Sequence, residues 1–171
     1  MNRISVLLAD DHRIVAEGLR RLLEAEFELA GVVEDGRALL AAAKELKPDV
    51  IISDITMPEL NGVEALEELK LVDPDVKLVF LTMHHNAAYA KRALEAGALG
   101  YVLKHSATEE LIMAVRAASM GRTFVSPAIT GDLMKAMRDS DEADMDPVRK
   151  LTLRQREILR LLVDGHTAKV I

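Results

Sequence analysis

The sequence contains no cysteine, and only 3% of its residues are aromatic. The lack of cysteine excludes a disulfide framework, a thiolate nucleophile and any cysteine-ligated zinc or iron–sulfur site. The scarcity of aromatic residues predicts an aliphatic core. No apolar run approaches the roughly 20 residues that span a bilayer, and the apolar stretch Ile4–Ala9 runs straight into acidic residues, unlike a signal peptide. We therefore expect a cytoplasmic protein that does not contact membranes.

The length and net charge of the chain limit its domain organisation and its possible partners. At roughly 150 residues per domain, a chain of 171 residues predicts one full domain and a remainder. The net charge of −6 gives no support to non-specific binding of nucleic acid by the chain as a whole.

Short apolar runs alternate with helix-like segments up to about residue 120. The runs are continuously apolar, as expected for strands that are covered on both faces of a sheet. Repeated strand–helix units imply a parallel sheet with right-handed crossovers and helices on both faces. We therefore predict an α/β fold, a doubly wound five-stranded parallel sheet of flavodoxin-like order 2-1-3-4-5. The predicted strands are Ile4–Ala9, Leu29–Val33, Val50–Ser53, Leu78–Thr82 and Leu99–Leu103.

The pattern changes after the fifth strand–helix unit. Pro127 can open a further helix. The acidic run Asp139–Asp146 predicts a solvated linker, because like charges repel and few apolar groups are available for burial. An amphipathic helix is expected next, with Thr152 and Gln155 at capping-box spacing. We expect three parts, a domain over 1–122, a helical and acidic linker over 123–149, and an all-α fragment over 150–171.

The carboxyl ends of the predicted strands carry the candidate chemistry. In a doubly wound sheet, ligands bind beyond these ends, where the strand order reverses. Polar side chains at the ends of the first, third, fourth and fifth strands should therefore converge on one crevice. They are Asp10, Asp11, Asp54, Thr82 and Lys104.

Three carboxylates in one crevice repel one another unless a counter-charge is present. Mg²⁺ meets this need, because it takes oxygen ligands such as carboxylates, waters and phosphate oxygens. Lys104 adds a positive charge and Thr82 a hydroxyl donor. This set suits phosphoryl transfer to a carboxylate, which depends mostly on positioning and charge neutralisation. Asp54, on the central strand, is the best candidate nucleophile.

The spaced elements of this crevice resemble the receiver domain of two-component systems. They are Asp10-Asp11, the run Asp54-Ile55-Thr56-Met57-Pro58 with Gly62 following, Thr82, and Tyr101 three residues before Lys104. The resemblance covers roughly residues 3–122, and the five elements together are highly specific. It implies that Asp54 accepts a phosphoryl group from a histidine kinase. It also implies a Mg²⁺ site made by Asp11, Asp54 and the Thr56 carbonyl, with Asp10 assisting through water.

The same resemblance implies roles at the fourth and fifth strands. Thr82 and Lys104 would contact the phosphoryl oxygens. Tyr101 would be the switch aromatic, which turns inward when Thr82 moves toward the phosphate. Our own hypothesis is that Thr56 and His84, each two residues past a site residue, line the path of hydrolytic water and set the phosphoryl lifetime.

A shorter resemblance lies at the C-terminal end. The run from Leu151 to Leu159, followed by Gly165-His166-Thr167-Ala168-Lys169, is similar to the start of a LuxR-type helix-turn-helix. With the receiver, it points to the NarL/FixJ class of response regulators. That class implies binding of promoter DNA, and homodimer formation on phosphorylation. A helix-turn-helix reads DNA with its second helix, which this chain lacks, so we expect either a truncated protein or one that has lost DNA binding.

Two other functions stay open. The receiver could act as a phosphorylation-dependent protein-binding switch without DNA binding. Less favoured is a Mg²⁺-dependent aspartyl-phosphate hydrolase, which would need a second acid two residues after the nucleophile, where Thr56 stands. His84 and His85 are adjacent and point opposite ways on an extended segment, so a metal site there is disfavoured. His12 is interpreted as a helix-start residue, not a phosphocarrier.

Overall fold

The computed structural model describes residues 3–106 and 108–143, in which strands and helices alternate along the chain. The helix-turn-helix fragment predicted over 150–171 lies outside the described residues. The strands are β1 (Ser5–Ala9), β2 (Glu28–Val33), β3 (Val50–Ser53), β4 (Leu78–Thr82), β5 (Gly100–Leu103) and β6 (Phe124–Val125). The helices are α1 (Arg13–Glu26), α2 (Gly36–Leu46), α3 (Gly62–Val72), α4 (Ala87–Glu95), α5 (Thr108–Ser119) and α6 (Pro127–Ala143).

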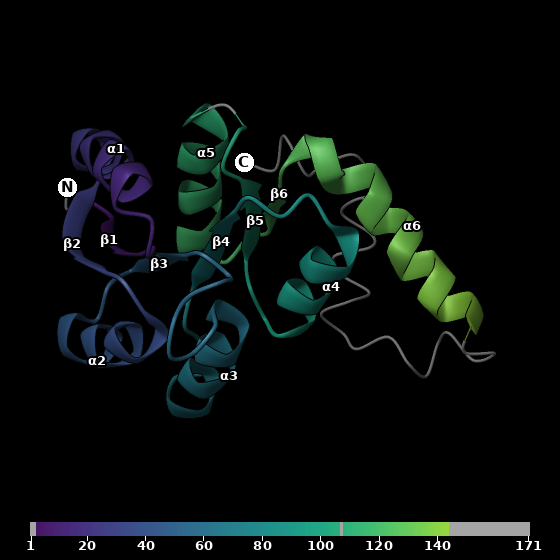
Figure 1. Cartoon of the computed structure of the whole chain (residues 1–171), viewed down its shortest axis with the longest axis horizontal. Coiled ribbons are helices and arrows are strands. Elements are labelled where there is room, and N and C mark those ends of the chain that lie inside the picture. The colour runs from purple at the N-terminus through teal and green to yellow at the C-terminus, as the bar shows by residue number, and fades with distance from the viewer. Residues whose placement is uncertain (1–2, 107, 144–171) are drawn as a thin grey trace.

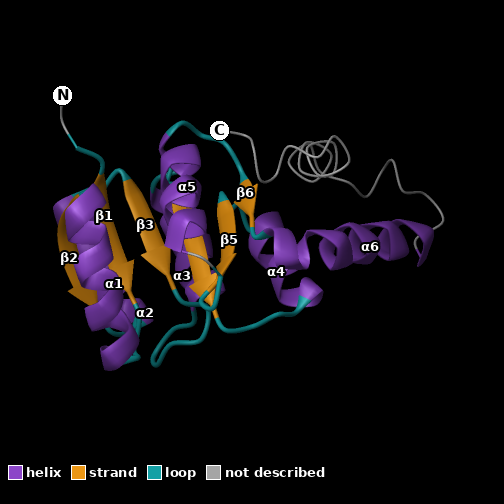
Figure 2. Ribbon diagram, turned by 90° about the horizontal axis from the view of Figure 1, so that it is seen from above, coloured by secondary structure: helices purple, strands orange, loops and turns teal. Residues whose placement is uncertain are grey.

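The strands form one parallel sheet of order β2-β1-β3-β4-β5-β6 (Figure 2). The predicted order 2-1-3-4-5 is confirmed for the first five strands, but the predicted number of five strands is too low. The sixth strand pairs Phe124 with Gly100 and Val125 with Tyr101, and both of its residues are buried. A strand of two residues is too short to show a hydrophobic period, which is why the sequence pattern missed it.

Helices cover both faces of the sheet, as predicted. Figure 1 shows α1 and α5 on one face and α2, α3 and α4 on the other. Each face has its own apolar cluster, with Leu23 and Val115 on the first and Leu39, Leu66 and Leu94 on the second. Among the described residues, no helix combines the length and the apolar character needed to cross a bilayer.

Helix α6 packs beside α4 at the end of the sheet (Figure 1). Its residues Ile129, Leu133 and Met137 recur at helical spacing and are buried in the same apolar cluster as α4. The helix continues to Ala143, so the acidic run expected as linker begins inside it at Asp139. Acidic side chains repel one another but do not break a helix that is already docked. The predicted division of the chain at residue 122 stays a prediction, and the segment just after it shares the core of the sheet.

Candidate functional site

The carboxyl ends of β1 and β3 place two aspartates next to each other. The two strands pair in parallel with Ala9 opposite Ser53, and the Asp54 N–H donates to the Ala9 carbonyl over 2.9 Å. Asp10 and Asp54, one residue further along each strand, therefore emerge at the same level. Both side chains are nearly inaccessible, with 1% and 4% of their surface exposed.

Lys104 supplies the positive charge between these two carboxylates. Its ammonium group lies 2.7 Å from Asp10 Oδ2 and 2.9 Å from Asp54 Oδ2. Its backbone is fixed by a 2.8 Å hydrogen bond from its N–H to the Thr82 carbonyl. Burial lowers the pKa of Lys104, but the hydrogen bonds and charges of Asp10 and Asp54 outweigh burial and hold the pKa above its ordinary value. The lysine is therefore charged throughout the physiological range.

Backbone groups fix the orientation of Asp54. Its Oδ1 accepts hydrogen bonds from the N–H groups of Ile55, at 2.7 Å, and Thr56, at 3.4 Å. Helix α3 begins just beyond this loop, and the Gly62 N–H donates to the Ile55 carbonyl over 2.6 Å. A Cβ at Gly62 would collide with the Asp54 carbonyl oxygen. Glycine at this position thus allows the helix start to approach the backbone of the acceptor loop.

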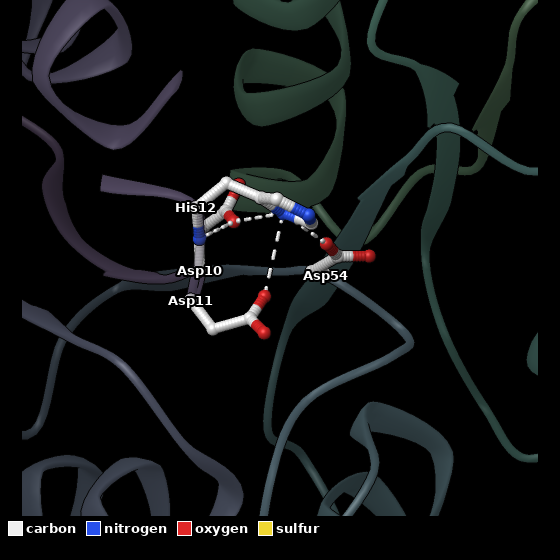
Figure 3. A group of neighbouring side chains, drawn as sticks. All are labelled: Asp10, Asp11, His12 and Asp54. Carbon is white, nitrogen blue, oxygen red and sulfur yellow. Dashed lines mark hydrogen bonds and ion pairs between the residues drawn. The ribbon is translucent and has the colours of Figure 1, made fainter. Parts of the chain in front are cut away.

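Asp11 and His12 complete an acidic cluster at the end of β1 (Figure 3). Asp11 Oδ1 is buried yet accepts no hydrogen bond from the described residues, and its ion-pair partner is His12 Nδ1 at 3.3 Å. His12 Nδ1 also lies 3.1 Å from Asp10 Oδ1 and 3.5 Å from Asp54 Oδ2. One donor atom from each of these four residues lies within 4.8 Å of the others. Carboxylate oxygens that converge in this way, one of them without a hydrogen bond, fit a divalent cation such as Mg²⁺.

Strands β4 and β5 also contribute two neutral hydroxyl groups, those of Thr82 and Tyr101. Thr82 is fully buried, and its Oγ1 accepts a hydrogen bond from the His84 N–H over 3.1 Å. Tyr101 is also fully buried, and its hydroxyl donates to the His84 carbonyl over 2.8 Å. Burial raises the pKa of Tyr101, with smaller contributions from the charges of Asp54 and Tyr89. Tyr101 therefore points inward and holds the β4–α4 loop through an un-ionised hydroxyl.

His84 connects the acceptor loop with helix α4. Its Nε2 lies 3.0 Å from Thr56 Oγ1, in the loop that follows Asp54. On the other side, its ring lies against the ring of Tyr89 in α4, with 4.8 Å between ring centroids. The two residues that the sequence placed at the same hydrolytic path are thus in contact across 28 positions of the chain.

The structure brings together most of the residues predicted for the site. Asp10, Asp11, Asp54 and Lys104 form one cluster, and Thr82, Tyr101 and Thr56 all bond to His84. The roles assigned to these residues stay predictions, including metal binding by the Thr56 carbonyl and by Asp10 through water.

One member of the site was missed. His12 does begin helix α1, at its N-cap position, as the sequence predicted. Its ring, however, lies among the three carboxylates (Figure 3). The only signal in the sequence was its position directly after Asp10 and Asp11.

Comparisons with known proteins place this arrangement in a family. The family model described as the response regulator receiver domain matches residues 6–116. The chain is 36% identical to the transcriptional regulatory protein DegU of Brevibacillus brevis, over 99% of this chain and 79% of that protein. Both matches include the cluster at the strand ends.

Solved structures give the same result. A LuxR-family two-component response regulator from Aurantimonas sp. SI85-9A1 has a TM-score of 0.75 at 34% identity, covering 79% of this chain and 98% of that one. A structure of the two-component response regulator RcsB in complex with DNA has a TM-score of 0.73 at 30% identity, covering 96% of this chain and 78% of RcsB.

Proposed function

The chain belongs to the LuxR-type two-component response regulators through its receiver domain, and from this premise we propose that it is a switch set by phosphorylation of Asp54. The donor is a histidine kinase, and the output is regulation of transcription. The observation that carries the proposal is the buried Asp54 carboxylate, bonded to the Lys104 ammonium at 2.9 Å inside a cluster of carboxylates. An aspartate held in this way is oriented as an acceptor and lies beside a cation that can bind the incoming oxygens.

The acidic cluster suits Mg²⁺ as the resident ion. Asp11, Asp54 and the carbonyl of Thr56 would hold it, with Asp10 assisting through water. Asp11 Oδ1, which accepts no hydrogen bond from the described residues, supports this assignment, because a buried carboxylate oxygen without a donor is costly unless a cation approaches it. When bound, Mg²⁺ supplies positive charge next to the phosphoryl oxygens.

The geometry of Asp54 and Lys104 supports the proposed phosphoryl transfer. A carboxylate oxygen of Asp54 forms a bond to phosphorus while the bond from phosphorus to the kinase histidine nitrogen breaks. The electron pair of the broken bond returns to the imidazole, which takes up a proton. Lys104 is within reach to follow the new oxygens, because its ammonium already contacts Asp54 Oδ2. The Thr82 hydroxyl would exchange its bond with the His84 N–H for a phosphoryl oxygen.

The switch then passes from Thr82 and Tyr101 to the helices. Phosphorylation adds about −1.5 to −2 charges at pH 7, and movement of Thr82 would disturb the loop that Tyr101 holds through the His84 carbonyl. The next residue, His85, lies with Nε2 3.1 Å from the Ala128 carbonyl in α6. This chain of contacts supports a change in the packing of α4 and α6, hence in output contacts and homodimer formation. A phosphate biases such a change only through contacts that differ between the two states.

Thr56 and His84 are proposed to tune the lifetime of the phosphoryl group. Their side chains meet over 3.0 Å beside the acceptor loop, where attacking water would have to pass. Replacing both should change the rate of dephosphorylation without removing the acceptor.

DNA binding is proposed for the complete C-terminal domain, in keeping with the solved complex of RcsB with DNA. We propose a receiver over 1–122, a helical and acidic linker over 123–149 and a LuxR-type output fragment over 150–171, and place the protein in the cytoplasm. The alternative, a protein-binding switch without DNA binding, keeps the same acceptor site. It differs in predicting no phosphorylation-dependent affinity for promoter fragments.

The test is stoichiometric labelling with acetyl phosphate in Mg²⁺, followed by intact-protein mass spectrometry. The wild-type protein should gain one phosphoryl group, and Asp54→Asn should gain none. Asp132→Asn is the matched control, because Asp132 is exposed on α6, away from the site. Labelling of Asp54→Asn at the wild-type rate would refute the acceptor assignment. Continuous turnover of p-nitrophenyl phosphate would favour the hydrolase instead.

A further inference from the structure

His12 occupies an unusual place for a residue that starts a helix. It is the N-cap of α1, but its side chain makes no capping hydrogen bond to the helix. Its backbone N–H donates to Asp10 Oδ1 over 2.9 Å, which directs the ring toward the carboxylates. The side chain is 56% exposed, so it lies at the solvent side of the cluster, and Figure 3 shows its ring beside the three carboxylates.

The spacing of the imidazole from the carboxylates resembles that of neighbouring ligands around one ion. His12 Nδ1 lies 3.1, 3.3 and 3.5 Å from oxygens of Asp10, Asp11 and Asp54. In an octahedral site with bonds of about 2.1 Å, adjacent ligand atoms are about 3.0 Å apart. The nitrogen is thus at ligand spacing from Asp11 and Asp54, the two carboxylates proposed to hold the ion, and it also lies 3.4 Å from Lys104 Nζ.

We propose that His12 is a nitrogen ligand of the divalent-cation site, so that this site favours Mn²⁺, which accepts imidazole more readily than Mg²⁺ does, more strongly than its oxygens alone would. The inference rests on the proposed function, because it assigns a further residue to the same metal site. Mg²⁺ prefers oxygen ligands and keeps its waters, whereas imidazole suits the transition metals better. His12 should therefore contribute to Mn²⁺ binding and contribute little to Mg²⁺ binding.

A different role for His12 makes the opposite prediction. If the ring only pairs with the carboxylates and competes with the ion for them, its removal should strengthen the binding of Mn²⁺ and Mg²⁺ alike. The effect of His12 on the Mn²⁺/Mg²⁺ affinity ratio separates the two roles.

The experiment measures binding of Mn²⁺ and of Mg²⁺ alone to the whole chain by calorimetry, and the Mn²⁺ complex by pulsed EPR. The wild-type complex should show nitrogen coupling from one directly bound imidazole. His12→Ala should abolish the coupling and weaken Mn²⁺ binding at least about tenfold, the loss that even a group supporting a ligand can cause. Mg²⁺ affinity should change much less. His12→Asn should also lose the coupling, and it keeps a favourable N-cap for α1.

The matched control is His85→Ala, since His85 bonds to the Ala128 carbonyl and is not part of the acidic cluster. This variant should keep both the nitrogen coupling and the affinity ratio. Absence of coupling in the wild-type complex, coupling that persists in His12→Ala, or equal changes for the two ions would overturn the inference. Failure of the proposed function is distinguishable, because it would appear as absent labelling of Asp54 whatever residue stands at position 12.

Discussion

The two halves of the site differ in kind, although they lie on the same edge of one sheet. The ends of β1 and β3 contribute carboxylates, Asp10 and Asp54, which are held by the Lys104 cation and by backbone N–H groups. Strands β4 and β5 contribute the buried hydroxyl groups of Thr82 and Tyr101, both bonded to the backbone of His84. One half therefore concentrates charge, and the other contains neutral groups packed against helices.

This difference corresponds to two tasks. A group that captures a phosphoryl needs fixed charges, because electrostatic stabilisation is strongest where donors are preorganised. A group that transmits the change needs contacts that can exchange at low cost, and a neutral hydrogen bond is worth only about 1 kcal/mol. The β4–β5 half is also linked to α4 and α6, because α4 packs on β5 and α6 packs on α4.

The largest expected effect comes from Lys104, which directly follows β5 but neutralises the carboxylates of the β1–β3 half. Lys104→Ala should lower the free energy of unfolding by about 3 kcal/mol, because it leaves two buried carboxylates without their cation. Urea denaturation in EDTA measures this loss. Arg20→Ala is the control, because Arg20 forms an exposed ion pair with Glu24, and its loss should stay within about 0.5 kcal/mol. Similar losses in the two variants would remove the distinction between a charged interior and an ordinary surface.

A smaller loss of stability is expected from a change at Tyr101, in the half of the site that contains neutral hydroxyl groups. Tyr101→Phe keeps the buried ring but removes the hydroxyl that donates to the His84 carbonyl. The free energy of unfolding should fall by about 1 kcal/mol. Tyr89→Phe should change it by less than about 0.5 kcal/mol, because the Tyr89 hydroxyl donates no hydrogen bond among the described residues and the ring is 39% exposed. If Tyr101→Phe matched its control, the inward hydroxyl would not hold the loop.

The smallest expected effect is a change in the pH at which Tyr101 ionises, measured by absorbance. The chain has two tyrosines, so Tyr89→Phe leaves Tyr101 as the single chromophore that ionises to absorb near 295 nm. Burial raises the pKa of Tyr101, so the folded variant should show no ionisation at about pH 10, where an unfolded tyrosine titrates. Above about pH 10 the native state then retains a proton on Tyr101 that the unfolded state releases. The contribution of Tyr101 to the free energy of unfolding is therefore constant below about pH 10 and falls as pH rises above it. Titration of the folded and urea-unfolded variant checks this, and coincident curves would contradict the burial argument.

Some residues and elements of the site could be predicted from the sequence, and others could not. Asp10, Asp54 and Lys104 were identified from their places after strands, because parallel strands bring their carboxyl ends to one edge. The length and register of β6 were not accessible, because Phe124 and Val125 are too few to form a pattern and pair only through the surrounding fold. Docking of α6 on α4 was not predicted either: the sequence indicated a helix that begins at Pro127, but not the burial of Ile129, Leu133 and Met137 against α4.

The sequence by itself determined the alternation of strands and helices, the strand order and the set of charged groups at one edge, since these follow from hydrophobic period and from chain order. Tertiary structure decided which side chains touch: the His12 ring among the carboxylates, Thr56 against His84, and the Tyr101 hydroxyl on the His84 carbonyl. These contacts join loops far apart in the chain. Their geometry depends on side-chain rotamers and loop paths, which only the packed fold fixes.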